Sequence, residues 1–331
     1  MFSKPLDLLA IGDITIDAFI KLKEAEVHCD VDRDECQICM DFASKVPYES
    51  VEEVPAVGNS ANAAVSAARL GLQSGLVAHL GADKNGRTCL SVLRKEKVRT
   101  KYVSIEKGKK TNYHYVLWYD AERTILVKHQ DFKYSLPNLK SPKWIYLSSL
   151  ASGTEKYHQE IISYLAANPK VKLAFQPGTF QMVLGTEFLA PIYQRSEIFI
   201  CNVQEAEKIL KLGKSEIKVL LAGIRTLGPK TVLITDGPKG SYLLDDSGSY
   251  FMMTYPDPKP PYERTGAGDA FASTFVSAVI LGNANKEALM WASINAMSVV
   301  QKVGAQKGLL SPTEIKTFLD KAPTDFRPVT I

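Results

Sequence analysis

The segment Arg264-Thr-Gly-Ala-Gly-Asp269 is the most informative part of this sequence, and it runs directly into the small-residue segment Ala270-Phe-Ala-Ser-Thr-Phe-Val-Ser-Ala-Val-Ile280. Together they predict a glycine turn that opens a helix. The first amides of a helix lack backbone partners and lie at its positive end, so such a turn favours an anion such as phosphate. Asp269 is therefore either a helix cap or a base that accepts a proton from a hydroxyl group beside the phosphate.

Outward from this turn, apolar runs alternate with helical segments. Runs typical of buried parallel strands lie at 6–12, 74–80, 143–147, 172–175, 198–201 and 231–235. Helical patterns lie at 59–70, 88–97, 155–167 and 205–211. The alternation predicts an α/β fold in which helices cover both faces of a doubly wound, mostly parallel sheet. We expect residues 1–331 to form one domain.

Two segments, about 18–54 and 102–132, depart from this rhythm because their apolar residues alternate with polar ones. Val27, Cys29 and Val31 alternate in this way, and Ile38 and Met40 follow after a polar stretch. Such alternation is typical of strands with one solvated face. The two segments predict a small antiparallel sheet, inserted in the domain, that could close over a pocket as a lid.

The aromatic residues Tyr113, Tyr115 and Trp118 fall within the second of these segments. They could stack on a sugar or base, although packing within the lid is the commoner outcome.

The charge balance argues against several classes of partner. The chain has 40 basic and 36 acidic residues and a formal net charge of +4, which is too balanced for a bulk nucleic-acid-binding surface. The basic run Lys107-Gly-Lys-Lys110 is best explained as a solvated turn. Because no secretory signal and no membrane-spanning apolar run is visible, we expect no membrane partner. Five cysteines, an odd number, favour a reducing compartment, and the cytoplasm is the expected location.

A cluster of His28, Cys29, Cys36 and Cys39 raises the question of zinc. Adjacent residues on a strand point to opposite sides, so the pattern favours cysteines that pack as soft core residues. Asp30, Asp32 and Asp34 resemble the start of a calcium loop, but no glycine occupies its sixth position.

His114 and His129 have no evident partners for a catalytic triad, and we predict no catalytic role for either residue.

Seven short motifs, taken together in this order, resemble the ribokinase, or PfkB, family of carbohydrate kinases. They lie at Gly12–Asp17, Gly58–Asn62 with the helix ending at Gly71, Gly81–Gly86, Asn202–Glu205, Thr235–Gly240, Thr265–Ala270 and Gly304–Ala305. The resemblance implies a ribokinase-like fold with a β lid. It also implies an ATP-dependent kinase that transfers the γ-phosphoryl group to a hydroxyl of a sugar or nucleoside.

The resemblance assigns a role to each matching residue. Asp269 is the implied catalytic base, and the backbone of Gly266, Ala267 and Gly268 is the implied anion hole. The implied substrate-binding residues are Asp17, Gly58, Asn59 and Asn62. The implied nucleotide-binding residues are Asn202, Thr235, Gly237, Gly240 and Gly304. Glu205 and Asn202 would organise Mg²⁺, partly through water, with ATP as co-substrate. Pairing of two lids in a homodimer is also implied.

The departures from the family pattern concern two positions. Val57-Gly58 stands where the family has paired glycines, so the close approach of substrate there could differ. Glu263-Arg264 replaces an Asp-Thr pair whose Asp is associated with a monovalent cation in some members, which leaves potassium dependence open. Arg264 could add positive charge for a phosphate or acidic substrate, or could point to solvent.

Two other functions share this fold. One is a non-catalytic regulator that binds a small molecule, and the presence of Asp269 favours an enzyme over it. The other is a kinase for a hydroxymethylpyrimidine-type vitamin precursor, and the full lid argues against it.

Neutral furanoses and nucleosides remain comparable as substrates. A phosphosugar would need basic residues such as Lys21, Lys128 or Arg123 aimed at the pocket.

Overall fold

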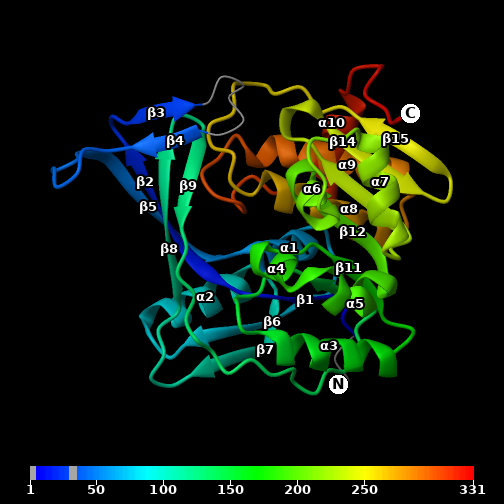
Figure 1. The fold of residues 1–331 in the computed structure, drawn as a ribbon, viewed down its shortest axis with the longest axis horizontal. Coiled ribbons are helices and arrows are strands. Elements are labelled where there is room, and N and C mark those ends of the chain that lie inside the picture. Colours follow the sequence, from blue (N-terminus) through cyan, green and yellow to red (C-terminus); the bar gives the residue numbers. More distant parts are fainter. Residues whose placement is uncertain (1–4, 30–35) are drawn as a thin grey trace.

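The computed structural model describes residues 5–29 and 36–331 and places them in a large sheet, a smaller sheet and a hairpin (Figure 1). The large sheet has ten strands in the order β16-β15-β14-β13-β12-β11-β10-β1-β6-β7. Neighbouring strands from β13 to β7 are parallel, and β14 to β16 add an antiparallel edge. The predicted mostly parallel sheet is confirmed. Its strands are β1 (Leu8–Ile11), β6 (Ser74–Gly81), β7 (Arg99–Glu106), β10 (Trp144–Leu147), β11 (Lys172–Phe175), β12 (Ser196–Asn202), β13 (Thr231–Thr235), β14 (Ser241–Asp245), β15 (Gly248–Met252) and β16 (Val329–Thr330).

Helices cover both faces of this sheet. The first face carries α1 (Asn59–Arg69), α2 (Lys84–Lys95), α8 (Ala267–Ile280), α9 (Asn285–Val299) and α10 (Pro312–Asp320). The second carries α3 (Glu155–Ala167), α4 (Thr179–Phe188), α5 (Ala190–Arg195), α6 (Val203–Leu210) and α7 (Ile217–Thr226). Successive residues of β1 serve the two faces in turn, since Leu8 and Ala10 join the first buried cluster and Leu9 and Ile11 the second. The sheet is therefore doubly wound, as predicted.

The small residues of α8 have a packing function. Residues 270–278 are buried around the whole helix, which contacts both α9 and α1. Small side chains let the three helices approach closely, and this packing fixes the glycine turn that precedes α8.

The smaller sheet, here called the lid, stands beside the large sheet (Figure 1). Its strands are β5 (Tyr48–Val57), β2 (Thr15–Leu22), β8 (Asn112–Tyr119) and β9 (Glu122–Leu126), in that order. The predicted small sheet is confirmed, with β2 and β8 as a parallel pair within it. Residues 102–106, which the alternation assigned to the lid, instead belong to β7. An edge strand of the large sheet also has one solvated side, so its pattern resembles that of a lid strand.

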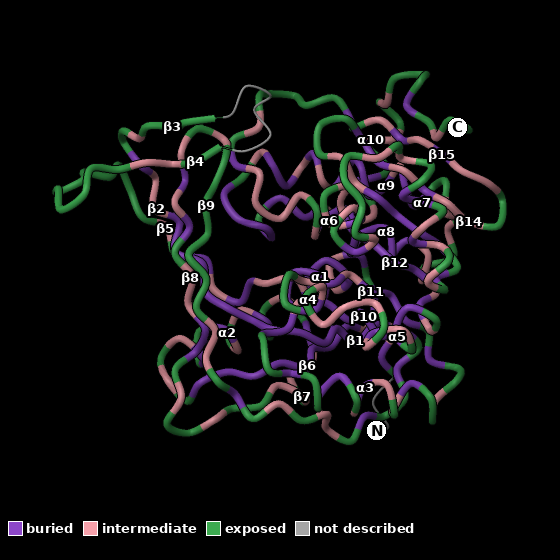
Figure 2. The backbone as a smooth tube through the Cα atoms, viewed as in Figure 1, coloured by how far each residue is buried: buried purple, intermediate pink, exposed green. Residues whose placement is uncertain are grey.

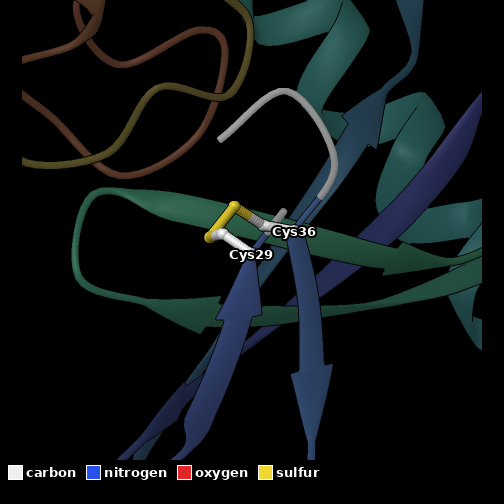
Figure 3. Close-up of a disulfide and its surroundings, with 2 residues drawn as sticks. All are labelled: Cys29 and Cys36. Atoms are coloured by element: carbon white, nitrogen blue, oxygen red, sulfur yellow. A yellow bond between two sulfur atoms is a disulfide. The ribbon is translucent and has the colours of Figure 1, made fainter. Parts of the chain in front are cut away.

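The hairpin of β3 (Glu26–Cys29) and β4 (Cys36–Cys39) corrects the prediction for the cysteines. Cys29 and Cys36 lie opposite each other and form a disulfide (Figure 3). Both residues are exposed, so the interpretation as soft core residues is wrong, and a single disulfide offers no zinc site. Across the described residues, no group of His, Cys, Asp or Glu is arranged to hold a metal ion by itself. Asp30, Asp32 and Asp34 lie outside the described residues.

Burial follows the same division (Figure 2). The central strands and the helix faces against them are buried, while the hairpin and the connecting loops are exposed. Lys107 to Lys110 form the predicted turn, with Gly108 at φ 76°. In the part of the chain that the structure describes, no helix has the length and apolar character needed to span a membrane.

Candidate active site

The candidate site lies at the carboxyl ends of the parallel strands. The neighbours of β1 are β6 on one side and β10 on the other, so the chain winds away from β1 in two directions and leaves a crevice there. Polar residues occupy the strand ends: Asp13 after β1, Gln176 after β11, Asn202 in β12 and Thr235 in β13. With residues of the lid they line one cavity of about 400 Å³.

Most of the residues predicted for the site line this cavity. Those brought together are Asp17, Gly58, Asn59, Asn62, Asn202, Glu205, Thr235, Gly266, Gly268 and Asp269. Four predicted residues are not among the lining residues: Ala267, Gly237, Gly240 and Gly304. Gly240 has a structural reason to be glycine, because its φ is 111° and a Cβ there would lie 2.4 Å from the carbonyl oxygen of Met252.

The two glycines of the turn differ in what surrounds them. Gly266 adopts a left-handed conformation (φ 82°), and a Cβ there would lie 2.2 Å from the Cβ of Ala305. A Cβ at Gly268 would meet no atom within 4 Å. The first backbone bond of α8 runs from Ala270 N–H to the Gly266 carbonyl at 2.8 Å, so the amides of Gly268 and Asp269 precede it. Gly266 therefore shapes the turn, and Gly268 leaves open space above free amides.

Three side-chain amides hold the carboxylate of Asp269. Asn59 Nδ2 donates to Oδ1 at 3.0 Å, and Asn62 Nδ2 donates to Oδ2 at 2.8 Å. Gln176 Nε2 donates to Oδ1 at 3.3 Å. Asn62 is fixed in turn by Gln306 Nε2, which donates to its Oδ1 at 2.9 Å. The carboxylate is thus oriented from two sides of the site.

The surroundings of Asp269 suit a proton acceptor. Loss of hydration raises the pKa of its carboxyl above the ordinary range, and the negative charge of Asp17 acts in the same direction. The hydrogen bonds from Asn62 and Gln176 and the positive charge of Arg123 lower this pKa, but they do not outweigh desolvation. A carboxylate with a raised pKa is a stronger base than an exposed one.

Two Asp–His pairs flank the lid side of the cavity. Asp17 on β2 faces His114 on β8 in the sheet register, with 3.5 Å between Oδ1 and Nδ1. Asp13 Oδ2 lies 3.4 Å from Nδ1 of His129, and Asp13 also accepts a hydrogen bond from the Tyr134 hydroxyl at 2.7 Å. Both histidines thus have an acidic neighbour from a distant part of the chain, which no local pattern revealed. That neither is catalytic stays a prediction.

The pair formed by Asp17 and His114 has unused polar atoms. Asp17 Oδ1 and His114 Nε2 are both buried and have no hydrogen-bond partner. Buried polar groups in proteins are nearly always satisfied, so these two atoms are exceptions at the edge of the cavity that both residues line.

The aromatic residues predicted for the lid do not line the cavity. Trp118 is buried, donates to the Asp120 carbonyl and contacts the ring of Tyr262. Tyr113 and Tyr115 contact each other. Packing is therefore the outcome for Trp118, whereas Tyr115, in contact with Tyr113, is 49% exposed. The aromatic ring that lines the cavity is Phe180, whose centroid lies 5.7 Å from that of His129.

Asn202 and Glu205 form a reciprocal cap at the start of α6. Asn202 Oδ1 accepts from the Glu205 amide, and Glu205 Oε2 accepts from the Asn202 amide, both at 2.8 Å. Desolvation raises the pKa of Glu205, and the charge of Asp269 adds to this effect. Mg²⁺ is commonly held by one or two carboxylates together with water and substrate phosphates. Glu205 lines the same cavity as the phosphate-favouring turn and so fits that requirement.

The substituted pair Glu263-Arg264 makes contacts within the protein. Arg264 Nε lies 3.4 Å from Glu122 Oε1 on the lid, and Arg264 is not among the residues that line the cavity. Glu263 is buried, and its two oxygens accept from the amides of Thr265 (2.7 Å) and Gly304 (3.3 Å). The cationic side chain on the cavity is instead Arg123.

Sequence reasoning missed Asp13, Gln176 and His129. Gln176 directly follows β11 and Asp13 lies two residues after β1, so the rule that ligands bind at the carboxyl ends of parallel strands could have found both. His129 carries no such signal, because its contact with Asp13 exists only once the lid has folded against the sheet.

Comparisons with known proteins agree with this geometry. Residues 24–312 match the pfkB family of carbohydrate kinases. An uncharacterised sugar kinase of Buchnera aphidicola subsp. Schizaphis graminum is 23% identical over 329 residues, which covers 95% of this chain and 96% of the relative. Ribokinase of Arabidopsis thaliana, solved with ribose and ATP, has a TM-score of 0.77 at 18% identity and covers 96% of this chain and 99% of its own.

A candidate ribokinase II of E. coli, solved with ATP and Mg²⁺, has a TM-score of 0.74 at 17% identity and covers 96% of this chain and 99% of its own. At these identities the solved structures speak to the fold, and they confirm that it is ribokinase-like.

Proposed function

The chain belongs to the pfkB family of carbohydrate kinases, and on that premise we propose that it transfers the γ-phosphoryl group of ATP to a hydroxyl group of a sugar or nucleoside. The observation that carries the proposal is the position of Asp269. Its carboxylate, with a raised pKa, lies at the start of α8 beside the open space above Gly268 and lines the same cavity as Asp17 and Asn62.

The proposed mechanism is an in-line transfer. Asp17, Asn59 and Asn62 orient the acceptor, with Gly58 allowing close approach, and Asp269 accepts the proton of the attacking hydroxyl. The backbone of the turn from Gly266 to Gly268, above all the Gly268 amide, stabilises the negative charge that develops on the transferred phosphoryl group, whereas the Ala267 amide already donates to the Arg264 carbonyl at 3.4 Å. The hydrogen bonds that Asn59 and Asn62 donate to Asp269 would rearrange when the hydroxyl arrives.

The nucleotide half of the proposal rests on the strand ends beyond β11. Thr235 and Asn202 line the cavity and would contact ATP, and Glu205 with Asn202 would hold Mg²⁺, partly through water. When bound, the metal neutralises charge on the phosphates. Gly237, Gly240 and Gly304 are proposed to lie along the nucleotide outside the part of the cavity described above. The ligands of the E. coli structure support ATP and Mg²⁺ as the pair to test first.

A screen of sugars and nucleosides with Mg-ATP tests the function. We expect one class of acceptor to raise the melting temperature and to stimulate ADP release. Stabilisation by a small molecule without ADP release would support the regulator instead. ADP release with hydroxymethylpyrimidine-type compounds only would support a vitamin-precursor kinase.

His114→Ala is expected to raise the KM of the acceptor about ten-fold, the effect of losing one hydrogen bond to a charged group. The substitution removes both the partner of Asp17 and a cavity-lining imidazole with a buried, unsatisfied Nε2. The KM of ATP should change little. His28→Ala is the matched control, because His28 is exposed on the hairpin, pairs with the nearby Glu26 and does not line the cavity. Steady-state kinetics with each substrate varied in turn checks this, and an unchanged acceptor KM would contradict it.

We also propose that two copies associate through the outer face of the lid. Residues of the lid that alternate with those facing the cavity form this face: Ile20, Val51, Tyr115, Leu117 and Leu126. Val51, Tyr115 and Leu126 are 47%, 49% and 51% exposed, which is unusual for large apolar side chains gathered on one sheet face.

Leu126→Lys is expected to convert the dimer into a monomer, since an unpaired charge within an apolar interface is costly. Val183→Lys, at an exposed position on α4, should leave the dimer intact. Light scattering after size exclusion measures the mass of each variant. A wild-type protein that is monomeric at micromolar concentration would rule out this association.

A further inference from the structure

Gln176 links the carboxylate of Asp269 to the buried hydroxyl of Tyr146. Tyr146 on β10 is paired with Ala174 of β11, and Gln176 follows two residues later on the same face of the sheet. The Tyr146 hydroxyl donates to Gln176 Oε1, and Gln176 Nε2 donates to Asp269 Oδ1 at 3.3 Å. A chain of two hydrogen bonds thus runs from the floor of the sheet to the carboxylate.

The orientation of the Gln176 amide is fixed by this chain. Burial raises the pKa of Tyr146 well above its ordinary value, so its hydroxyl keeps its proton and remains a donor. A donor at one end of the amide selects Oε1 there and turns Nε2 toward Asp269. The reversed amide would place Oε1 against the carboxylate, where two acceptors would repel each other.

We propose that Gln176, held by Tyr146, is a positioning residue that fixes the Asp269 carboxylate in its ionised, proton-accepting state. The inference rests on the proposed function of Asp269 as the base. Gln176 differs in this role from Asn59 and Asn62, the other two donors to Asp269. Those two residues lie on α1, and we expect their side chains to turn toward the acceptor when it binds. Gln176 is the donor whose position does not depend on substrate.

Charged groups from several elements also act on Asp269. Asp17 on β2 disfavours its ionised form and Arg123 on β9 favours it. Glu205 on α6 is close enough to interact with Asp269 electrostatically. All of these groups remain in place when Gln176 is replaced, so a change in the titration of activity reports on the lost amide.

Gln176→Leu, which keeps the approximate size but removes the donor, is the main test. A hydrogen bond donated to a carboxylate lowers its pKa, so its loss raises that pKa. In a plot of kcat against pH, the acid limb is the part where kcat falls as the pH is lowered. We expect this limb to move to higher pH by about one pH unit, and kcat near neutral pH to fall about ten-fold. The KM of the acceptor should stay nearly constant.

Gln176→Glu and Tyr146→Phe extend the test. The first places a second carboxylate beside Asp269 and should move the acid limb further in the same direction. The second leaves the amide free to turn and should produce a smaller move of the same sign, which keeps the test informative if Gln176→Leu folds poorly. Gln181→Leu is the control: Gln181 is a buried amide bonded to His158 and the Gly178 amide, so its loss should lower stability without moving the limb.

Three outcomes would overturn the inference. An unmoved acid limb in Gln176→Leu would show that the amide does not influence the base. A raised acceptor KM with an unmoved limb would make Gln176 an acceptor-binding residue. An acid limb that moves equally far in Gln181→Leu would show that a general loss of stability, and not the Gln176 amide, causes the shift. Failure of the proposed function is distinguishable, because it would appear as retained activity in Asp269→Asn.

Discussion

Asp269→Asn is expected to lower kcat about 10³-fold, the middle of the range for loss of a general base. An amide of the same shape cannot accept the proton of the attacking hydroxyl. It also presents its own N–H₂ group to the amide donors of Asn59, Asn62 and Gln176. The KM of ATP should change far less than kcat, because Asp269 acts on the acceptor.

The pH dependence of the wild type follows from the same carboxylate. Because the pKa of Asp269 is raised, the base becomes protonated as the pH falls through that value, and kcat falls with it. The acid limb should be absent from the residual activity of Asp269→Asn. Asp320→Asn, at an exposed position at the end of α10, should match the wild type. Stopped-assay kinetics across pH measures both features, and wild-type turnover in Asp269→Asn would remove this residue from the reaction.

Gly268→Ala is expected to lower kcat/KM for ATP roughly 10²-fold, comparable to the loss of one backbone donor in an anion hole. The added methyl group enters the open space above the turn, where no protein atom lies within 4 Å. A phosphoryl group can then no longer approach the amides closely. The fold should tolerate the change, because Gly268 is helical and alanine favours a helix by about 0.5–1 kcal/mol over glycine.

The control for this variant is Gly213→Ala. Gly213 also has open space around it and no left-handed backbone requirement, but it lies outside the cavity. Both variants should melt at or above the wild-type temperature, and only Gly268→Ala should lose activity. Unchanged kcat/KM in a folded Gly268→Ala would contradict the phosphate-binding role of the turn.

The sequence predicted the parts of the fold that have strong local patterns. Buried strands such as Leu8–Ile11 and Thr231–Thr235 are continuous apolar runs, and the glycine turn before α8 has its own chemistry. The sequence did not predict helix α9, because its own apolar and small residues are spread around the whole helix. It therefore has no polar face to give a helical period. The local pattern could not separate β7 from the lid, because edge strands of either sheet have one solvated side.

Site residues that stand in sequence motifs were predictable. Those brought together only by tertiary contacts were not. Asp269, Asn62 and Glu205 stand in recognisable motifs, and all three line the cavity. The pairing of His114 with Asp17 depends on the register between β2 and β8, two strands about 100 residues apart in the chain. Nothing local in the sequence specifies that register. The exposed Cys29–Cys36 pair likewise depends on which hairpin residues face each other.

The most direct test follows the phosphoryl group itself. ATP labelled in its γ-phosphate is incubated with the protein, Mg²⁺ and the acceptor that the screen selects, and the products are separated. We expect the label in a phosphate ester of the acceptor, formed by the wild type and nearly lost in Asp269→Asn. Label released only as inorganic phosphate, or an ester formed equally by both proteins, would contradict hydroxyl-directed transfer with Asp269 as the base.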